Sequence, residues 1–457
     1  MFADTVHTPM NLMENMPDEG QARSANLARA PQLHAAVPPM VARIRFQIIG
    51  ALLFAVVLPA IVRYGFDFYK FADASQTNSI IAATLAILTG YYFQRRLVNF
   101  PGVLASSYIV PTFFASFAAI ILLFFFARIE YARAFIGSSF LLCAVWFYLI
   151  YFWTKRIKSA PIGIVPGGAS DKLLDTPDMD WIELQNPSVD GIAVSGVAVD
   201  LRAQLLPEWE RFIAQCALSG LPVFHYKQLR ESLTGRLEIE QLSENTLGTL
   251  LPNLAYMKVK QFLDFLLALI LLPLILMIMA FAAVGILIAD GRPIFFKQTR
   301  VGFQGRRFTV YKFRTMRVGS SEAPSADPDS ALEKAQTKEA DERIYGFGTW
   351  LRRSRIDELP QIINVLRGEM SWIGPRPEAE VLSEWYERQI PFYSYRHIVY
   401  PGISGWAQVN QGHVVAVDAV NEKLHFDFYY IKNYSPWLDI LIIMRTIRTV
   451  FLGQGAR

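Results

Sequence analysis

The sequence predicts a membrane protein of mixed α/β class. We expect a four-helix transmembrane bundle, a small Rossmann-like parallel α/β domain, and a second α/β domain that begins with a re-entrant membrane helix. Three observations carry this prediction. The 457 residues are 53% hydrophobic and only 18% charged, a balance too apolar for an ordinary soluble protein. Four long apolar stretches come early in the chain, and short apolar segments alternate with a helical pattern after them.

The N-terminal part divides into a tail and a bundle. Residues 1–43 lack clear periodicity, so we predict a disordered tail without a cleavable signal peptide. Residues 44–155 hold four apolar stretches, each near the roughly 20 residues that cross a bilayer. The predicted spans are residues 46–62, 77–93, 108–127 and 135–153. A buried helical bundle in a soluble protein is disfavoured, because these stretches are rich in aromatic residues and nearly uncharged.

Basic residues orient the predicted spans. They precede the first span, follow the second and follow the fourth: Arg43, Arg45, Arg95, Arg96, Lys155 and Arg156. The positive-inside rule therefore puts the N-terminus, the loop after the second span and everything after Trp153 in the cytoplasm.

Residues 156–250 are expected to form a small cytoplasmic domain. Strands are predicted at residues 162–168, 181–184, 191–195 and 222–226, with an amphipathic helix at 201–218. Strands that alternate with helices indicate a parallel sheet. Gly167 and Gly168 after the first strand can cradle a phosphate, but no G-x-G-x-x-G pattern is present. We prefer a nucleotide-binding-like fold that serves as spacer or regulator.

A further apolar stretch, residues 265–289, is interrupted by Pro273. It is long enough to span a bilayer, yet basic residues stand on both sides, with Lys258 and Lys260 before it and Arg292 after it. Positive charge at both ends argues that both ends are cytoplasmic. Because proline removes a helical hydrogen bond, we predict a re-entrant helix at about residues 260–287 that breaks at Pro273 and dips into one leaflet.

The next segment is strongly basic. Residues 292–317 carry eight Lys and Arg residues and no Asp or Glu. Alternating residues on both sides of Gln304 and Gly305 predict a β-hairpin. Such a strand pair beside a membrane can bind anionic lipid heads or the diphosphate of a substrate. A merely solvated basic face is the alternative.

Residues 351–377 combine arginines, acids and a helix start. Asp357 and Glu358 come just before Pro360, and an apolar-periodic segment then runs to Gly368. Proline in the first turn and glycine past the end indicate a short helix, so both acids are expected just before its N-terminus. Unpaired N–H groups there favour carboxylates and phosphates. The stretch points to chemistry on a phosphorylated substrate, with plain helix capping as the alternative.

Four segments resemble the bacterial sugar transferase family, the monotopic polyprenyl-phosphate hexose-1-phosphate transferases. They are residues 295–316 (FFKQTRVGFQGRRFTVYKFRTM), 355–377 (RIDELPQIINVLRGEMSWIGPRP), 400–410 (YPGISGWAQVN) and 426–440 (FDFYYIKNYSPWLDI). The resemblance covers about residues 255–457 and implies a catalytic phosphoglycosyl transferase domain at residues 251–457. The four leading spans and α/β domain resemble the long subgroup that starts exopolysaccharide or O-antigen repeat units.

The resemblance implies a two-step exchange at the cytoplasmic face of the bacterial inner membrane. A UDP-sugar gives its sugar-1-phosphate to an enzyme carboxylate and releases UMP, and undecaprenyl phosphate then attacks this covalent intermediate. The family's acidic pair falls on Asp357, the implied nucleophile, and Glu358, the implied Mg²⁺ ligand. The family's phosphate-handling positions fall on Lys297, Arg300, Arg314 and Arg376, and the break of its re-entrant helix falls on Pro273.

The sugar and partners are expectations from the same resemblance. Glucose is expected, because many long-subgroup members use UDP-glucose, and galactose is the main alternative. The lipid bilayer and downstream glycosyltransferases are expected partners, a homodimer is allowed for, and no nucleic acid is expected. An inactive scaffold or regulator of polysaccharide assembly is the second interpretation. Two D-x-D strings, at residues 178–180 and 327–329, and the histidines His397, His413 and His425 lack the context of a metal site.

Overall fold

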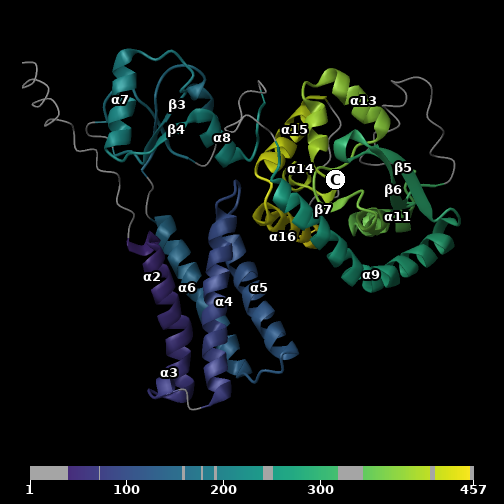
Figure 1. The fold of residues 1–457 in the computed structure, drawn as a ribbon, viewed down its shortest axis with the longest axis horizontal. Helices are drawn as coiled ribbons and strands as arrows, with labels where there is room; N and C mark the ends of the chain where they lie inside the picture. The colour runs from purple at the N-terminus through teal and green to yellow at the C-terminus, as the bar shows by residue number, and fades with distance from the viewer. Residues whose placement is uncertain are drawn as a thin grey trace, which may run out of the picture. The chain divides into compact units, whose positions relative to one another are not determined.

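The computed structural model describes residues 40–70, 73–156, 160–176, 179–189, 193–239, 251–317, 343–411 and 417–452 (Figure 1). Most of the predicted tail, residues 1–39, lies outside these ranges. His413, Asp178 and the second D-x-D string at residues 327–329 also lie outside them. The chain divides into two compact units, one of residues 1–47 and 149–230 and the other of residues 48–148 and 231–457.

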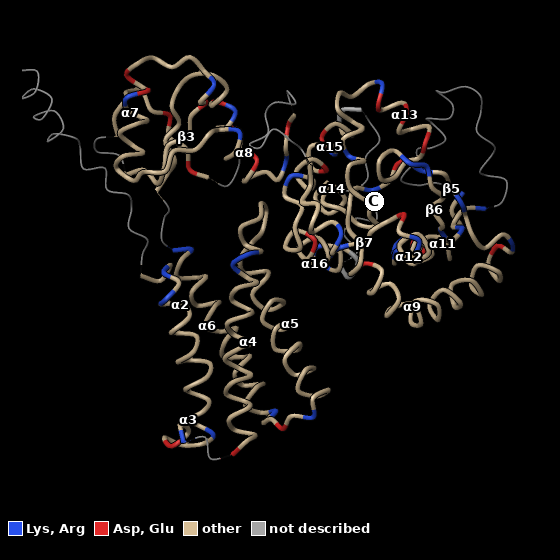
Figure 2. Tube along the Cα trace, viewed as in Figure 1, with Lys and Arg blue, Asp and Glu red and all other residues tan. Residues whose placement is uncertain are grey.

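Helices occupy all four predicted spans. The first combines α2 (Ile44–Leu52), a π-helical turn (Leu53–Val57) and α3 (Leu58–Tyr64), and α4 (Ala74–Val98), α5 (Ala105–Phe126) and α6 (Arg133–Arg156) follow. Aromatic contacts join the last three, because Phe113 and Tyr91 both stack on Phe147, with ring centroids 4.6 and 5.6 Å away. Charged residues gather near the helix ends (Figure 2).

Four helices among the described residues are long and apolar enough to cross a membrane. They are Ile44–Tyr64, Ala105–Phe126, Arg133–Arg156 and Leu254–Asp290. The 25 residues of α4 contain the predicted second span and reach roughly 37 Å at 1.5 Å per residue. Polar side chains in its first two turns, from Ser75 to Asn78, make α4 less apolar than the others. Its crossing stays a prediction.

The small α/β domain contains a four-stranded parallel sheet in the order β2-β1-β3-β4. Strands β1 (Ile162–Ile164), β2 (Trp181–Glu183) and β4 (Val223–His225) lie inside predicted segments. The prediction for β3 was wrong, because the strand is Gly196–Val199, whose four residues are all buried between β1 and β4.

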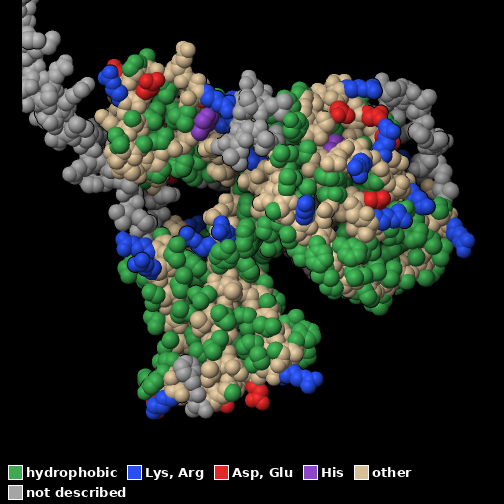
Figure 3. Space-filling view, in the orientation of Figure 1, with side chains coloured by type: hydrophobic (Ala, Val, Ile, Leu, Met, Phe, Trp, Pro, Cys, Tyr) green, Lys and Arg blue, Asp and Glu red, His purple; other side chains and the backbone are tan. Residues whose placement is uncertain are grey.

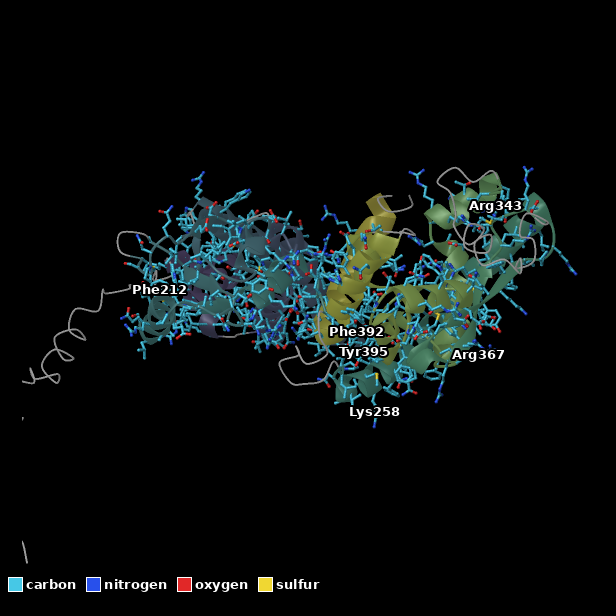
Figure 4. The ribbon with its side chains drawn as sticks, turned by 90° about the horizontal axis from the view of Figure 1, so that it is seen from above. Phe212, Lys258, Arg343, Arg367, Phe392 and Tyr395 are labelled. Carbon is cyan, nitrogen blue, oxygen red and sulfur yellow. The ribbon has the colours of Figure 1, made fainter. Side chains whose placement is uncertain are left out.

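The helix of this domain, α7 (Pro207–Leu218), begins later than residue 201. Proline at the first helical position fixes the start, because it has no N–H to leave unpaired. Phe212, labelled in Figure 4, is buried against the sheet with Trp209. This apolar face of α7 closes the core of the domain.

The C-terminal domain begins with α9 (Leu254–Asp290) and a hairpin of β5 (Phe295–Val301) and β6 (Arg307–Phe313). The predicted turn is confirmed, with φ of 55° at Gln304 and 73° at Gly305. A second two-stranded sheet of this domain consists of the parallel strands β7 (Ser371–Ile373) and β8 (Gly402–Ser404). The remaining helices are α11 (Gly346–Arg353), α12 (Ile362–Leu366), α13 (Glu380–Gln389), α14 (Trp406–Asn410), α15 (Val417–Lys432) and α16 (Pro436–Leu452).

Pro273 does not break α9 into two helices. The predicted helix–break–helix is one continuous helix of 37 residues with Pro273 near its middle, where the ribbon bends (Figure 1). Proline removes one backbone hydrogen bond, and the bonds on either side continue the helix. Hydrophobic side chains cover the visible face of α9 (Figure 3). Ile270, Met277 and Phe281 of this helix are all exposed. Such a surface suits a lipid environment.

Both ends of α9 are fastened to the C-terminal domain. Near its start, Lys260 Nζ lies 2.7 Å from Asp439 Oδ2 of α16. At its end, Asp290 forms an ion pair with Arg314, just after β6. A helix that crossed the membrane once would carry its two ends to opposite sides, so these contacts agree with a re-entrant course.

We expect both ends of α9 to face the same side of the membrane. Single cysteines at Lys258 and Arg292, both exposed, should react with an impermeant maleimide only after the cells are permeabilised. Lys70, exposed in the loop after the first span, supplies a control cysteine that should react in intact cells. Labelling of the Arg292→Cys variant alone in intact cells would show that α9 crosses the membrane.

Candidate active site

Asp357 and Glu358 lie in a turn of 3₁₀ helix, Ile356–Gln361, that leads directly into α12. The prediction placed them just before a helix N-terminus, and they lie inside the first helical turn instead. Arg355, the residue before this turn, has a left-handed φ of 58°. That conformation costs a non-glycine residue roughly 1–2 kcal/mol. It redirects the chain after α11, and the two acidic residues are 9% and 5% exposed.

Glu358 is paired with buried cations. Its Oε1 accepts hydrogen bonds from Arg376 Nη2 at 2.6 Å and from Lys312 Nζ at 2.9 Å. Burial by itself raises the pKa of Glu358, but the charges of Arg376, Lys312 and Arg355 outweigh it and hold the pKa well below its usual range. Burial lowers the pKa of Lys312 to about 8, although Glu358 favours its charged form. Glu358 is therefore ionised and neutralised by its neighbours.

Asp357 has a different environment. Burial and the negative charge of Glu358 raise its pKa to about 6, and nearby cations only partly offset this. Its Oδ1 is buried and has no hydrogen-bond partner among the residues that the structure describes. An unpaired buried acceptor costs roughly 1–3 kcal/mol. Asp357 Oδ1 is therefore available to a ligand. Glu358 Oε1 is not, because it already accepts two hydrogen bonds.

Arg376 reaches Glu358 from the loop after β7. The backbones of Gly374 and Gly402 approach so closely that a Cβ at 402 would lie 2.0 Å from the Gly374 nitrogen. Only glycine permits this approach. Gly402 N–H donates to the Pro375 carbonyl at 3.0 Å, and Arg396 Nη2 donates to the Arg376 carbonyl at 2.8 Å. These bonds hold the Pro-Arg-Pro segment from two sides.

The hairpin register decides which of its cations reach the acidic pair. Neighbouring residues of a strand point to opposite faces, and the pairing of β5 with β6 puts Arg300 and Lys312 on one face and Lys297 on the other. Arg300 is held by hydrogen bonds to the Pro377 carbonyl and to Gln298 Oε1, the latter at 2.9 Å. Burial and the charge of Arg376 lower the pKa of Arg300 to about 10.

Lys297 lies away from the acidic pair, on the exposed face of the hairpin. Its Nζ stands 5.8 Å from the ring centre of Tyr311, the residue opposite it on β6. Arg367, at the rim of the domain in Figure 4, donates to the hydroxyl of the same tyrosine at 3.0 Å. This exposed group can meet phosphate or lipid only outside the buried site.

Arg314 has a structural role in the described contacts. All five of its N–H donors are used, and the acceptors are the carbonyls of Asp290, Gly291, Pro293 and Met316 and the carboxylate of Asp290. A guanidinium has five donors in total. In this arrangement Arg314 fastens the C-terminal end of α9 and offers no donor to a phosphate, contrary to the role implied for it.

The structure thus brings together Asp357, Glu358, Arg376 and Arg300, and it adds Lys312. Lys312 is one of the eight basic residues of segment 292–317 but is not among the predicted site residues. The turn residues alone could not identify it, because a two-residue turn at Gln304 and Gly305 would pair Lys312 with Lys297, whereas the longer loop in the structure pairs it with Phe296. Residues paired across strands share a face, so Lys312 had to accompany Arg300.

The acidic pair fits a magnesium ion. Among the described residues no three His, Cys, Asp or Glu side chains gather as a metal centre. However, one or two carboxylates usually suffice for Mg²⁺ when substrate phosphates and waters complete its shell. Asp357 Oδ1 is unpaired, and Glu358 Oε2 lies 3.8 Å from Arg355 Nη1, beyond hydrogen-bond distance. These two oxygens can accept a cation while Glu358 Oε1 keeps its ion pairs.

The chain is similar to known proteins of one family. The family model described as bacterial sugar transferase matches residues 255–453. The UDP-N-acetylgalactosamine-undecaprenyl-phosphate N-acetylgalactosaminephosphotransferase of Aeromonas hydrophila is 40% identical over 410 residues, which cover 90% of this chain and 95% of that protein.

Two further relatives match less of the chain. The UDP-glucose:undecaprenyl-phosphate glucose-1-phosphate transferase of Xanthomonas campestris is 45% identical over 174 residues, covering 38% of this chain and 34% of that protein. The protein of the same description from Escherichia coli is 37% identical over 195 residues, covering 42% and 40%. Because the Aeromonas similarity extends over nearly both full lengths, the chain belongs to the bacterial sugar transferase family.

Proposed function

We propose that this protein transfers a sugar-1-phosphate from a UDP-sugar to undecaprenyl phosphate and releases UMP, with Asp357 as the nucleophile. The observation that carries the proposal is the contrast within the acidic pair. Glu358 is neutralised by Lys312 and Arg376, whereas Asp357 is buried with an unpaired oxygen and a raised pKa. A free carboxylate oxygen beside cations suits attack on a phosphate.

The proposed reaction has two displacements at one phosphorus atom. An Asp357 oxygen attacks the phosphorus that carries the sugar, and the bond from that phosphorus to the bridging oxygen breaks, so UMP leaves with the bridging oxygen. An oxygen of undecaprenyl phosphate then attacks the same phosphorus. The acyl-phosphate bond breaks and Asp357 is restored as a carboxylate. Two steps let one site serve a soluble donor and a lipid acceptor in turn.

The cations supply charge and position. Phosphoryl transfer needs mainly orientation and neutralisation of charge on the phosphate oxygens. Arg376 and Lys312 stand within 3 Å of Glu358 and beside Asp357, where they can face a bound phosphate. Arg376 suits two-pronged contacts, and Lys312 acts as a point charge. Mg²⁺, held by Asp357 and Glu358, would neutralise diphosphate oxygens when bound.

The membrane supplies the acceptor in this proposal. Both ends of α9 contact the C-terminal domain, and its exposed hydrophobic side chains suit one leaflet. The basic residues beside both ends favour the cytoplasmic face, where nucleotide sugars are made. We therefore place the site at the cytoplasmic surface of a bacterial inner membrane, with the lipid phosphate arriving from the bilayer.

The relatives differ in the sugar for which they are named. The Aeromonas relative is named for N-acetylgalactosamine and matches 90% of this chain, whereas the two glucose transferases match 38% and 42%. Agreement over the whole chain favours an N-acetylated hexosamine as the donor sugar. The expectation of glucose from sequence, with galactose after it, therefore takes second place. A homodimer and downstream glycosyltransferases stay predictions.

A panel of UDP-sugars tests the function and the sugar together. Purified protein in lipid nanodiscs should release many UMP molecules per enzyme from UDP-N-acetylgalactosamine when undecaprenyl phosphate is in excess, and at most one per enzyme without it. Turnover should be faster than with UDP-glucose or UDP-galactose. Each product is identified as lipid-linked sugar by mass spectrometry. Absence of UMP release with every donor would favour the scaffold interpretation.

The two acids should respond oppositely to neutralisation. Asp357→Asn should abolish UMP release and raise the melting temperature. The folded pKa of Asp357, about 6, exceeds the ordinary 3.8, so its ionisation costs about 3 kcal/mol of stability at neutral pH. Glu358→Gln should lower the melting temperature, because removing one partner of buried ion pairs costs roughly 3–5 kcal/mol.

Turnover and calorimetric melting of both variants check these effects. Near-normal turnover by Asp357→Asn would refute the covalent mechanism. A higher melting temperature for Glu358→Gln would refute the account of its ion pairs.

The value of kcat/KM should show a bell-shaped dependence on pH. Asp357 must be ionised to attack, so kcat/KM should fall about tenfold per pH unit below pH 6, its raised pKa. Lys312 loses its charge above about pH 8, which sets the upper limb. Lys312→Arg is the matched variant, because arginine stays charged and should remove the upper limb alone. An unchanged upper limb in Lys312→Arg would assign it to another group.

A further inference from the structure

Gln361 lies in the same short 3₁₀ turn as the acidic pair. It closes the 3₁₀ turn Ile356–Gln361, three positions after Glu358 and four after Asp357. In a 3₁₀ helix, side chains three positions apart lie over one another. The side chain of Gln361 is therefore expected next to that of Glu358, in the same turn that holds Asp357. It is only 2% exposed.

The side-chain nitrogen of Gln361 has no hydrogen-bond partner within the described part of the chain. Leaving a buried amide donor unpaired is costly, and native proteins rarely do so without a reason. Asp357 Oδ1, one turn earlier, is also buried and unpaired. Two unpaired polar atoms of one short turn, one a donor and one an acceptor, indicate a polar group that is bound there during function.

A neighbouring buried amide, Asn364, is fully hydrogen-bonded. Asn364, three positions after Gln361, is completely buried. Its Nδ2 donates to the Thr309 carbonyl and to Glu369 Oε2, both at 2.7 Å, and its Oδ1 accepts from Tyr311 N–H at 3.4 Å. The unpaired nitrogen of Gln361 thus differs from the amide of Asn364, and among the described residues of the 3₁₀ turn it is unpaired together with Asp357 Oδ1.

We propose that Gln361 Nε2 donates a hydrogen bond to an oxygen of the phosphoryl group that Asp357 receives and passes on. The inference rests on the proposed function. The phosphoryl oxygens accept hydrogen bonds strongly because they are charged. A neutral amide suits the task, since it binds the phosphoryl group without forming an ion pair with Asp357 before the substrate arrives. Gln361 is then a catalytic residue that contacts the reacting group.

The test uses Gln361→Met in the full-length enzyme in nanodiscs. Methionine fills similar space without a donor, so kcat for UMP release should fall by about 10- to 100-fold, the loss expected for a hydrogen bond to a charged group. KM for the UDP-sugar should change little, because the bond forms as the phosphoryl group is transferred. The melting temperature should stay equal or rise, because an unpaired buried donor is removed.

Gln408→Met is the matched control. Gln408 is a half-buried glutamine of α14 in the same domain and also has an unpaired atom, Oε1, among the described residues. Its change should leave kcat as in the wild type. The fall for Gln361→Met should be the same for every accepted UDP-sugar, because the phosphoryl group is common to all of them.

Three results would overturn the inference. One is wild-type kcat in Gln361→Met, which would mean that water or protein satisfies the amide. Another is a loss confined to one donor, which would assign Gln361 to the sugar. If Gln361→Met lowers the melting temperature, Gln361→Asn replaces it as the test variant, because asparagine keeps the amide but places it one methylene further back. Full activity of Gln361→Asn is the third result that would overturn the inference. Failure of the proposed function differs from all three, because the wild type itself would then release no UMP.

Discussion

The ion pairs of Glu358 with Lys312 and Arg376 are the constraint on which the site depends. They join three segments that are distant in sequence, namely β6, the 3₁₀ turn and the loop after β7. A buried carboxylate is costly unless it is paired and hydrogen-bonded. The cost is offset only when all three segments are in place. The site therefore forms as one unit, and a shift of any segment leaves a buried charge unpaired.

The same pairs leave Asp357 in a different state from Glu358. Lys312 and Arg376 both donate their shortest hydrogen bonds to Glu358. Asp357 therefore has a raised pKa and an oxygen without a hydrogen-bond partner among the described residues. Two adjacent carboxylates with opposite pKa shifts are a known route to separate roles in one site. Here the neutralised acid organises the cations, and its neighbour is the nucleophile in the proposed mechanism.

Much of this could be predicted from the sequence, where the pattern is local. The hairpin turn at Gln304 and Gly305, the apolar helices and the acidic pair all follow from short-range periodicity and residue type. What the sequence cannot predict depends on tertiary contacts. The sequence favours Lys297 and Arg314 as much as Arg300, because composition does not say which face of a strand a cation occupies. Register and the bonds at the end of α9 decide that.

Other misses have the same origin. The left-handed Arg355 places the acidic pair inside the helical turn, and nothing in its residue type predicts that conformation. β3 was misplaced because the preceding residues 191–195 have similar apolar character, and only pairing with β1 and β4 selects Gly196–Val199. The different environments of Asp357 and Glu358 follow from Lys312 and Arg376, which approach from elsewhere in the chain.

Residues next to the acidic pair pack against α9. Leu359 in the 3₁₀ turn and Ile362 at the start of α12 pack in one hydrophobic cluster with Ile286 and Met279 of α9. The turn that presents Asp357 therefore rests on α9 through apolar contacts, which tolerate little change in volume. In the proposed topology the bend of α9 fixes how deep that helix lies in the leaflet. The same packing then fixes the height of Asp357 relative to the lipid phosphates, so a soluble domain without α9 would lose both part of its core and its access to the acceptor.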